Sequence, residues 1–404
     1  MRIVVCGQVW PRPATEVNGA NALCPDPVRG EIGGVRALVI SRVYADPAAR
    51  GKLRALAGLG ATVTAAVPDR WVPAGLTQQQ QTSWGDDGGV RTVPIPIRGS
   101  ALPAADPFWH GGSVRQTLTD FRPDLIQIEE EPWSNAAAAI ARTARRLKIP
   151  YVIVSRESLP RSRGTLTRRR RNRALAGAAG GISGNELAGR RALRGHPSLP
   201  HRTIPQLGVN LPLTAERPGH SGLSLGFIGR LMPEKGLDLL FRAAVKLIGR
   251  WTLTVVGTGP AQEELEALAE RLGIAGRVTW RGALPRSAVE EVWPKLDVLV
   301  MPSRTTPRWT EVTARAAVEA MAHGLAVVGS AAGAIPESLG EAGIVVPEED
   351  VGALAGALQR LHDQPEEVRR LGAAGRRRAM ETYTDAAIAE RTLAFWNELL
   401  RATA

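Results

Sequence analysis

The chain has 404 residues, of which 44% are apolar and 22% are charged, and its formal net charge is +12. This length and composition allow two or three domains with buried cores, and they exclude a disordered or low-complexity protein. Cys6 and Cys24 are too few for a disulfide scaffold and lack the spacing of a metal site, so we expect a reduced, cytoplasmic protein. No apolar stretch approaches the roughly 18 to 20 residues that span a bilayer.

Residues 1–34 are rich in Pro, Gly and Asn and show no regular period, so we expect an N-terminal extension there. From Val35 onward, short apolar runs alternate with helical patterns, which is typical of a parallel sheet covered on both faces. A first domain is therefore expected over residues 35–210. Its predicted strands are 37–41, 61–67, 90–97, 125–128, 151–154 and 179–183, and its predicted helices include 47–58 and 185–193.

A proline-rich stretch leads to a second alternating series, and we place a hinge at residues 211–221 within it. The second domain is expected over residues 222–385, followed by a C-terminal helix at 386–404 that packs back on the first domain. Its predicted strands are 223–228, 252–256, 277–280, 298–301, 326–328 and 344–346, and its predicted helices are 237–248, 262–272, 288–295, 313–322, 351–361 and 366–381. The sequence thus predicts an α/β fold in which two Rossmann-like, doubly wound domains face a central cleft.

A basic turn from Gly229 to Gly236 follows the first predicted strand of the second domain. Gly229 is expected to permit a tight turn, Arg230 to lie at the cleft edge, and Lys235 to sit just before the next helix. A guanidinium and an ammonium beside a helix N-terminus suit a diphosphate. The alternative is a solvated basic turn without a ligand.

Two glutamates, Glu311 and Glu319, are separated by seven residues in a segment with a helical pattern. On one helix, eight steps advance about 12 Å and rotate about 80° beyond two turns, so the carboxylates would not share a proton. This argues against the paired carboxyls of a glycoside hydrolase and favours a ligand with hydroxyl groups at both ends. The alternative is two glutamates on an exposed helix face.

Glycines in the segment from Gly329 to Glu337, Gly333 among them, would let backbone amides approach an anion. On its own this pattern is weakly specific. A dinucleotide-type Gly-x-Gly-x-x-Gly is absent from both predicted domains, which argues against a nicotinamide enzyme.

Together these motifs resemble the retaining GT-B glycosyltransferases of family 4, and the resemblance extends over residues 35–400. It rests on the basic turn, the two glutamates, Val256-Gly257-x-Gly259-Pro260, Pro302-Ser303 and Gly340-Glu341-Ala342-Gly343. The sequence departs from the family at Thr313 and Ala314, where many relatives have Phe-Gly.

The resemblance implies roles for individual residues. Arg230 and Lys235 would bind the diphosphate of a nucleoside-diphosphate sugar, beside Gly229 and Gly333. Glu319 would bind the ribose and Glu311 the transferred sugar. The resemblance also implies transfer with retention of anomeric configuration, with no metal, no other cofactor and no enzymatic nucleophile.

On the acceptor side the resemblance is looser. Relatives often carry a glycine loop after the first strand, and Gly51 and Lys52 are the nearest counterparts here. A strand-end His-Glu-Pro in some members corresponds to Glu130-Glu131-Pro132, which makes Glu130 a candidate catalytic group near the acceptor hydroxyl. The open alternative is an acidic loop that merely follows the strand.

A basic stretch runs from Arg161 to Arg173. It would suit anionic lipid headgroups at the inner face of the cytoplasmic membrane, or an acceptor phosphate. The alternative is a solvated helix face in an arginine-rich protein. No aromatic residues interleave these arginines, which argues against nucleic acid as a partner.

The leading hypothesis is a retaining glycosyltransferase that moves a sugar from a nucleotide-sugar donor to a hydroxyl of a glycan, polyprenyl-linked or small-molecule acceptor. Two alternatives stay open. A non-hydrolysing nucleotide-sugar epimerase would change the donor without any acceptor. A catalytically silent GT-B partner subunit would release no nucleoside diphosphate.

Overall fold

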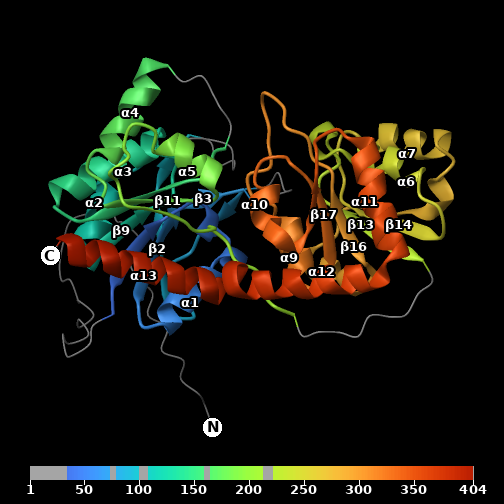
Figure 1. The fold of residues 1–404 in the computed structure, drawn as a ribbon. Coiled ribbons are helices and arrows are strands. Elements are labelled where there is room, and N and C mark those ends of the chain that lie inside the picture. Colours follow the sequence, from blue (N-terminus) through green and yellow to red (C-terminus); the bar gives the residue numbers. More distant parts are fainter. Residues whose placement is uncertain (1–33, 73–78, 100–107, 159–163, 213–221, 404) are drawn as a thin grey trace, which may run out of the picture.

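The computed structural model describes residues 34–72, 79–99, 108–158, 164–212 and 222–403. The predicted N-terminal extension, except Gly34, and most of the predicted hinge at 211–221 lie outside the described residues. The rest forms two α/β domains, each built on its own sheet (Figure 1). Each strand predicted for these domains is present, and the predicted fold class is confirmed.

The first domain is built on an eight-stranded sheet, parallel except for β5, which pairs antiparallel with β6. Its strands lie in the order β12 (His201–Thr203), β11 (Gly180–Ser183), β10 (Tyr151–Ser155), β9 (Leu125–Ile128), β1 (Arg36–Ile40), β2 (Thr62–Pro68), β6 (Val90–Ile95) and β5 (Gly85–Asp87). Two small antiparallel pairs stand apart: β3 (Arg70–Trp71) with β4 (Gln80–Gln81), and β7 (Ile97–Arg98) with β8 (Phe108–Trp109).

Helices cover both faces of this sheet, because its central strands are apolar on both sides. One face packs against α2 (Gly111–Phe121), α3 (Asn135–Arg146) and α4 (Thr165–Leu175). The other packs against α1 (Gly51–Gly58) and the C-terminal helix α13 (Asp385–Thr403). The remaining helical segments are η1 (Val43–Ala45), η2 (Pro47–Ala49) and α5 (Glu186–Ala192).

The second domain is built on a six-stranded parallel sheet. Its strands lie in the order β15 (Val278–Trp280), β14 (Trp251–Val256), β13 (Leu223–Ile228), β16 (Val298–Met301), β17 (Ala326–Ser330) and β18 (Ile344–Val346). One face packs against α6 (Leu237–Ala244), α7 (Gln262–Arg271), α11 (Val351–Asp363) and α12 (Pro365–Arg378), and the other against α9 (Arg315–Ala322) and α10 (Ile335–Leu339). Shorter segments are η3 (Pro233–Lys235), η4 (Ala275–Arg277), α8 (Arg286–Glu290), η5 (Trp293–Lys295), η6 (Gly340–Ala342) and η7 (Ala379–Tyr383).

In both domains the strand order reverses beside the first strand. The chain proceeds from β1 to β2 and β6 on one side and then returns to β9 on the other. It likewise proceeds from β13 to β14 and β15 and then returns to β16. The carboxyl ends of β1 and β9, and those of β13 and β16, therefore flank topological switch points, where open α/β sheets bind ligands.

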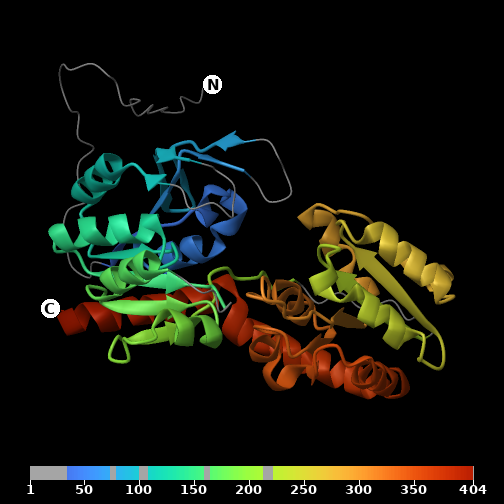
Figure 2. The same ribbon diagram turned by 90° about the horizontal axis from the view of Figure 1, so that it is seen from above.

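The end of the first domain's chain segment, at Gly208 and Val209, lies beside the start of α13. Val209 forms an isolated parallel bridge with Thr384, and the N–H of Gly208 donates to Asp385 Oδ1 at 3.2 Å. From there α13 runs along the first domain (Figures 1 and 2). Trp396 of this helix is fully buried and donates its indole N–H to Gln127 Oε1 at 2.9 Å. The last helix therefore belongs to the core of the first domain, although its sequence follows the second.

One helix begins later than predicted, and this changes the geometry of the site. The helical pattern predicted a helix over 313–322, with Glu311 beside it, but α9 begins at Arg315. Before it, the carbonyls of Glu311 and Val312 accept hydrogen bonds from Ala334 and Asn185, instead of from amides four residues on. The expectation that Glu311 and Glu319 share one helix is therefore wrong.

Candidate functional site

The turn after β13 and the loop after β16 meet at the switch point of the second domain. Lys235 Nζ lies 2.8 Å from Glu311 Oε2 and 3.1 Å from Oε1, and the Ser303 hydroxyl donates to Oε2 at 3.1 Å. The ammonium also lies 4.9 Å from the ring centre of Trp309. The side chains of Lys235 and Glu311 keep 18% and 9% of their surface exposed, so a ligand can reach the pair.

The backbone around Glu311 is fixed by its neighbours. Gly333 has a φ of 55°, and a Cβ there would lie 2.1 Å from the carbonyl oxygen of Glu311, so only glycine fits. That carbonyl accepts the N–H of Ala334 at 2.8 Å. From the first domain, Asn185 Nδ2 donates to the carbonyl of Val312 at 2.9 Å. Gly333 therefore acts by letting the Glu311 loop approach closely.

Gly229 and Arg230 lie in the turn directly after β13. The side chain of Arg230 is exposed, whereas Leu231 beneath it is fully buried. A Cβ added at Gly229 would have its nearest neighbour, the ring of Phe227, at 3.9 Å. The turn therefore has room for a side chain at position 229, and the tight-turn argument for this glycine is wrong.

Glu319 belongs to a separate cluster of charges on α9. Its Oε1 accepts from Arg315 Nε at 2.9 Å and lies 3.2 Å from Arg286 Nη2. The side chain is half-buried, which leaves it reachable from solvent. The structure thus holds Glu311 and Glu319 in two different ion-pair clusters, one with an ammonium and one with two guanidinium groups.

A pocket of about 610 Å³ lies between the two domains. The second domain contributes Arg286 and Arg315, the partners of Glu319, and the first domain contributes most of the rest. The charged side chains that line the pocket are six arginines and two aspartates: Arg42, Arg54, Arg70, Arg156, Arg286, Arg315, Asp46 and Asp385. Such a lining offers many guanidinium donors to an oxygen-rich or anionic ligand.

Gly51 lines this interdomain pocket at the start of α1. A Cβ there would lie 1.8 Å from Asp385 Oδ2, so the carboxylate of Asp385 packs directly against the backbone of Gly51 and leaves no room for a side chain. Burial raises the pKa of Asp385, although the N–H of Gly208 and the nearby Arg54 act in the opposite direction. Of the two predicted acceptor-side residues, Gly51 is the one that reaches the pocket.

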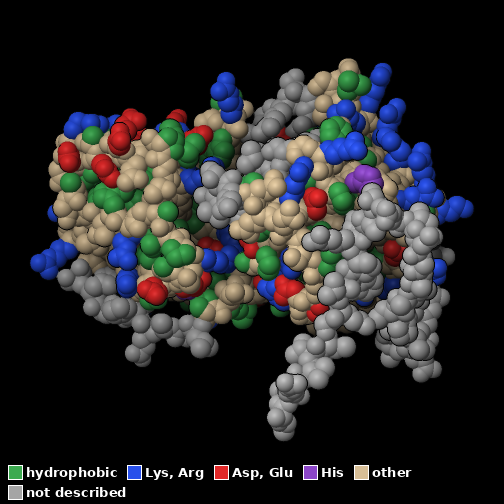
Figure 3. Space-filling model, turned by 180° about the vertical axis from the view of Figure 1, so that it is seen from behind, with side chains coloured by type: hydrophobic (Ala, Val, Ile, Leu, Met, Phe, Trp, Pro, Cys, Tyr) green, Lys and Arg blue, Asp and Glu red, His purple; other side chains and the backbone are tan. Residues whose placement is uncertain are grey.

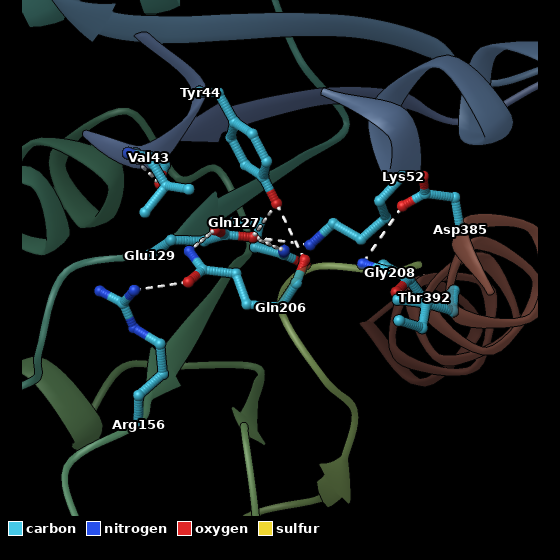
Figure 4. A network of polar contacts seen from close by, with 12 residues as sticks. Val43, Tyr44, Lys52, Gln127, Glu129, Arg156, Gln206, Gly208, Asp385 and Thr392 are labelled. Carbon is cyan, nitrogen blue, oxygen red and sulfur yellow. Dashed lines mark hydrogen bonds and ion pairs between the residues drawn. The ribbon is translucent and has the colours of Figure 1, made fainter. Parts of the chain in front are cut away.

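Lys52 instead lies in a buried polar network (Figure 4). Its Nζ is 2.9 Å from Glu129 Oε1, and the two side chains are 3% and 0% exposed. Gln127 and Tyr44 also donate to Glu129 Oε1, at 2.6 Å and 3.2 Å, and Gln206 donates to Oε2. Burial opposes ionisation of Glu129, but Lys52 and these hydrogen bonds outweigh it, so the pKa of Glu129 is lowered. This burial contradicts the expectation that Lys52 faces an acceptor.

Two further glutamates follow Glu129 at the end of β9. Glu130 is 1% exposed, and Arg42 Nε donates to its Oε1 at 3.0 Å. Glu131 accepts from the Ser155 hydroxyl at 2.8 Å, and burial raises its pKa. Arg42, rather than Glu130, is the member of its pair that lines the interdomain pocket. Glu130 therefore contacts a residue of the pocket lining without lining the pocket itself.

The basic stretch lies on α4, although Arg161 and Arg163 are outside the described residues. Arg168, Arg169 and Arg173 are exposed, and Leu166 beside them keeps 65% of its surface exposed. Figure 3 shows Lys and Arg side chains gathered along the outer edge of the N-terminal half. Among the helices of the described ranges, none is both long and apolar enough to cross a membrane.

Sequence reasoning missed three residues of this region. Arg315 stands four positions before Glu319, a spacing that brings side chains together on a helix, so its contact could have been predicted. Arg286 could not, because nothing in the sequence brings α8 beside α9. Asn185 was predicted only as the start of a helix, and its contact with Val312 spans 127 positions.

The chain is similar to known proteins in both halves. A family described as "Glycosyl transferases group 1" matches residues 222–364, and one described as "Glycosyl transferase 4-like domain" matches residues 45–205. Each match falls within one of the two domains. Together they leave only the ends and the segment between the domains unmatched.

Curated relatives match over shorter stretches. The chain is 34% identical over 163 residues to a GDP-mannose-dependent alpha-(1-6)-phosphatidylinositol monomannoside mannosyltransferase of Mycolicibacterium smegmatis, covering 39% of this chain and 43% of the relative. It is 30% identical over 236 residues to a 2-deoxystreptamine glucosyltransferase of Streptomyces kanamyceticus, covering 55% and 57%. The chain thus spans about half the length of these two relatives.

A solved structure shares the arrangement of both domains. HepE of Anabaena, in complex with UDP, aligns with a TM-score of 0.68 and 18% identity over 90% of this chain and 100% of that one. At this identity the likeness shows the fold alone. With two doubly wound domains, each matched by its own family model, the chain belongs to the group 1 glycosyltransferases of GT-B fold.

Proposed function

We propose that this chain transfers a sugar from a nucleoside-diphosphate sugar to an acceptor hydroxyl, with retention of anomeric configuration. The observation that carries the proposal is the cluster of Lys235, Glu311 and Ser303 at the switch point of the second domain. A diphosphate requires cationic partners, and a sugar ring that gains positive charge as its bond breaks is stabilised by a carboxylate. Lys235 and Glu311 bring both groups to one place.

The donor roles follow from the charges of the second domain. Lys235 neutralises Glu311 in the structure, and we propose that it moves to the diphosphate of a bound donor together with the exposed Arg230. The N-terminus of α6 begins two residues after Lys235 and adds its own positive potential. These groups balance the diphosphate charge in our proposal, which includes no metal or other cofactor.

Glu319 is proposed to hold the donor ribose, because a carboxylate accepts hydrogen bonds from both hydroxyls of a vicinal diol. Arg315 and Arg286 both contact Glu319 Oε1 and would orient that carboxylate for the ribose. Gly333 contributes indirectly, through the close approach of the Glu311 loop.

The interdomain pocket is proposed to bind the acceptor, and its charge favours an acceptor with an anionic group. Arg70 donates to the carbonyls of Ile97 and Gly99, and Arg156 donates to the amide oxygen of Gln206. Because these acceptors are neutral oxygens, the guanidinium of Arg70 keeps its charge for a ligand, whereas Arg156 also interacts with the carboxylate of Glu131. One relative is named for a phosphatidylinositol acceptor and another for 2-deoxystreptamine, an amine. The lining supports the first kind.

The proposal is tested in two steps. A thermal-shift series with UDP-, GDP-, ADP- and TDP-sugars identifies the donor. Release of nucleoside diphosphate is then measured with phosphate-bearing acceptors and with aminocyclitols, and we expect turnover with the former. A donor that is isomerised without an acceptor would indicate an epimerase, and binding without release would indicate a silent partner subunit.

We further propose that the protein works in the cytoplasm and contacts anionic membranes through the exposed arginines of α4. Replacement of Arg168, Arg169, Arg170 and Arg171 by serine should reduce co-sedimentation with phosphatidylglycerol liposomes at low salt. The matched control removes four charges from the second domain, at Arg242, Lys246, Arg271 and Arg281. Equal partitioning of the parent and the α4 variant would support the solvated-face alternative.

A further inference from the structure

Asn185 connects the two domains beside Glu311. It is the N-cap of α5 and only 3% exposed, and its Oδ1 accepts the N–H of Ala188 at 2.8 Å. Its Nδ2 donates to the carbonyl of Val312 in the second domain at 2.9 Å. The two ends of one amide therefore have separate tasks: the oxygen caps a helix of the first domain, and the nitrogen holds a loop of the second.

The orientation of this amide is fixed by the carbonyl of Val312 and the N–H of Ala188, whereas the hydroxyl of Ser158, which is 1% exposed, contacts both ends of the amide. Asn185 Nδ2 donates to the Ser158 hydroxyl at 2.8 Å, and that hydroxyl also lies 3.2 Å from Asn185 Oδ1. A flipped amide would turn its oxygen toward the carbonyl of Val312 and its NH2 toward the N–H of Ala188. Both contacts would then be repulsive, so the observed orientation is the stable one.

The next residue of α5 makes a second contact across the domain junction. The N–H of Glu186 donates to Glu337 Oε2 at 2.8 Å. Glu337 lies on α10, which begins directly after the N–H of Ala334 that binds the carbonyl of Glu311. The first turn of α5 thus contacts both segments that position Glu311, namely its own loop and the start of α10.

We infer that Asn185 is a positioning residue through which the first domain seats the Glu311 loop when the domains come together. Separation of the domains would break the hydrogen bond between Asn185 and Val312 and would release the carbonyl next to Glu311. Since this hydrogen bond forms only when the domains meet, closure and ordering of the loop favour each other. The catalytic consequence rests on the proposed role of Glu311, whereas the coupling itself does not.

Two replacements of Asn185 remove its contact with Val312 but retain its role as the cap of α5. Asp and Ser are both good N-caps, so Asn185→Asp and Asn185→Ser retain the bond to Ala188. Neither can donate from Nδ2: Asp places a carboxylate oxygen against the carbonyl of Val312, and Ser is too short to reach it. If both variants loosen the Glu311 loop equally, neither charge repulsion by the Asp nor loss of the helix cap can be the cause.

The first readout is amide hydrogen exchange on the full chain without any ligand. We expect exchange in residues 308–316 to become about tenfold faster in both variants, the scale of one lost hydrogen bond. Exchange in α5 should stay at the parent rate. Glu337→Gln, which keeps an oxygen acceptor for Glu186, is the matched control and should leave residues 308–316 unchanged.

The second readout is kinetic. Turnover should fall about tenfold in both Asn185 variants, while affinity for the bare nucleoside diphosphate stays within about twofold, since Lys235 and Arg230 are untouched. Unchanged exchange in 308–316, or equally faster exchange in α5, would overturn the inference. Faster exchange in 308–316, in a parent protein that transfers no sugar with any donor, would refute the proposed function and leave the coupling in place.

Discussion

Each domain holds a lysine–glutamate pair at its switch point, and the two pairs differ in what covers them. Lys52 and Glu129 join the segments after β1 and β9, and Lys235 and Glu311 join those after β13 and β16. The contact distances are nearly equal, 2.9 Å and 2.8 Å. The first pair is 3% and 0% exposed and the second 18% and 9%.

The difference comes from the neighbours of each carboxylate. Tyr44, Gln127 and Gln206 all donate to Glu129, so both of its oxygens are satisfied inside the domain. Within the described part of the chain, the carboxylate of Glu311 has the Ser303 hydroxyl as its one hydrogen-bond donor besides Lys235. The same topological position is thus sealed in one domain and open to solvent in the other, where we propose that a ligand binds. The predictions that follow separate these two uses.

The largest effect is expected from Lys52→Met, which leaves Glu129 charged and buried without its cation. The loss should be about 3 to 5 kcal/mol in the unfolding of the first domain, measured by chemical denaturation. Adding Glu129→Gln to this variant should recover much of the lost stability, because the buried charge is then gone. An unchanged denaturation midpoint for Lys52→Met would show that the pair is not structural.

The next effect concerns binding at the second pair. Lys235→Met should weaken nucleoside-diphosphate affinity by about 1.5 to 3 kcal/mol, the scale of a charge-assisted hydrogen bond. It should destabilise the fold less than Lys52→Met, since Glu311 keeps contact with solvent. Calorimetric titration with the bare nucleotide measures the effect, and Arg230→Gln should show a smaller one because Arg230 is exposed. Parent-like affinity in the Lys235 and Arg230 double variant would remove the diphosphate assignment.

A smaller effect is expected from Trp396→Phe, which removes the indole N–H bound to Gln127 but retains most of the packing. The expected loss is about 1 kcal/mol, seen as a lower midpoint for the first domain. Lys52 and Trp396 should respond in the same unfolding transition if α13 belongs to that domain. A loss confined to the second domain would contradict this placement.

The smallest expected effect is on the pH dependence of folding stability. The pKa of Glu129 is lowered from its ordinary value of 4.5 in the folded state, so the unfolded state binds more protons at acidic pH. The associated stability is complete above pH 4.5 and is lost as the pH falls through the lower folded value. The variant with Lys52→Met and Glu129→Gln should lack this part of the slope of stability against pH below pH 4.5. Parallel curves of unfolding free energy against pH for the parent and the double variant would contradict this expectation.

Much of the fold could be predicted from the sequence, because parallel strands buried on both faces appear as continuous apolar runs. The residues of the proposed donor site could also be predicted from the sequence, since Lys235 lies in a short motif directly after its strand. The partner of Lys52 could not be predicted, because Glu129 lies 77 positions away and no local pattern connects them. The loop of Glu311 was misread as helical because its carbonyls are held by Asn185 and Ala334, which only the tertiary structure brings there.

The central claim is that one of the two carboxylates acts on a substrate and the other on the fold. The most direct test is turnover of Glu311→Gln and Glu129→Gln at saturating donor, alongside titration with the bare nucleoside diphosphate. Glu311→Gln should lower kcat by about 10²-fold or more, the scale of one lost electrostatic contact with the transition state. Its nucleotide affinity should stay or rise, because Lys235 is released. Glu129→Gln should lose stability but keep the parent kcat per folded molecule. Parent-like turnover of Glu311→Gln, or an equal loss in both variants, would contradict the account.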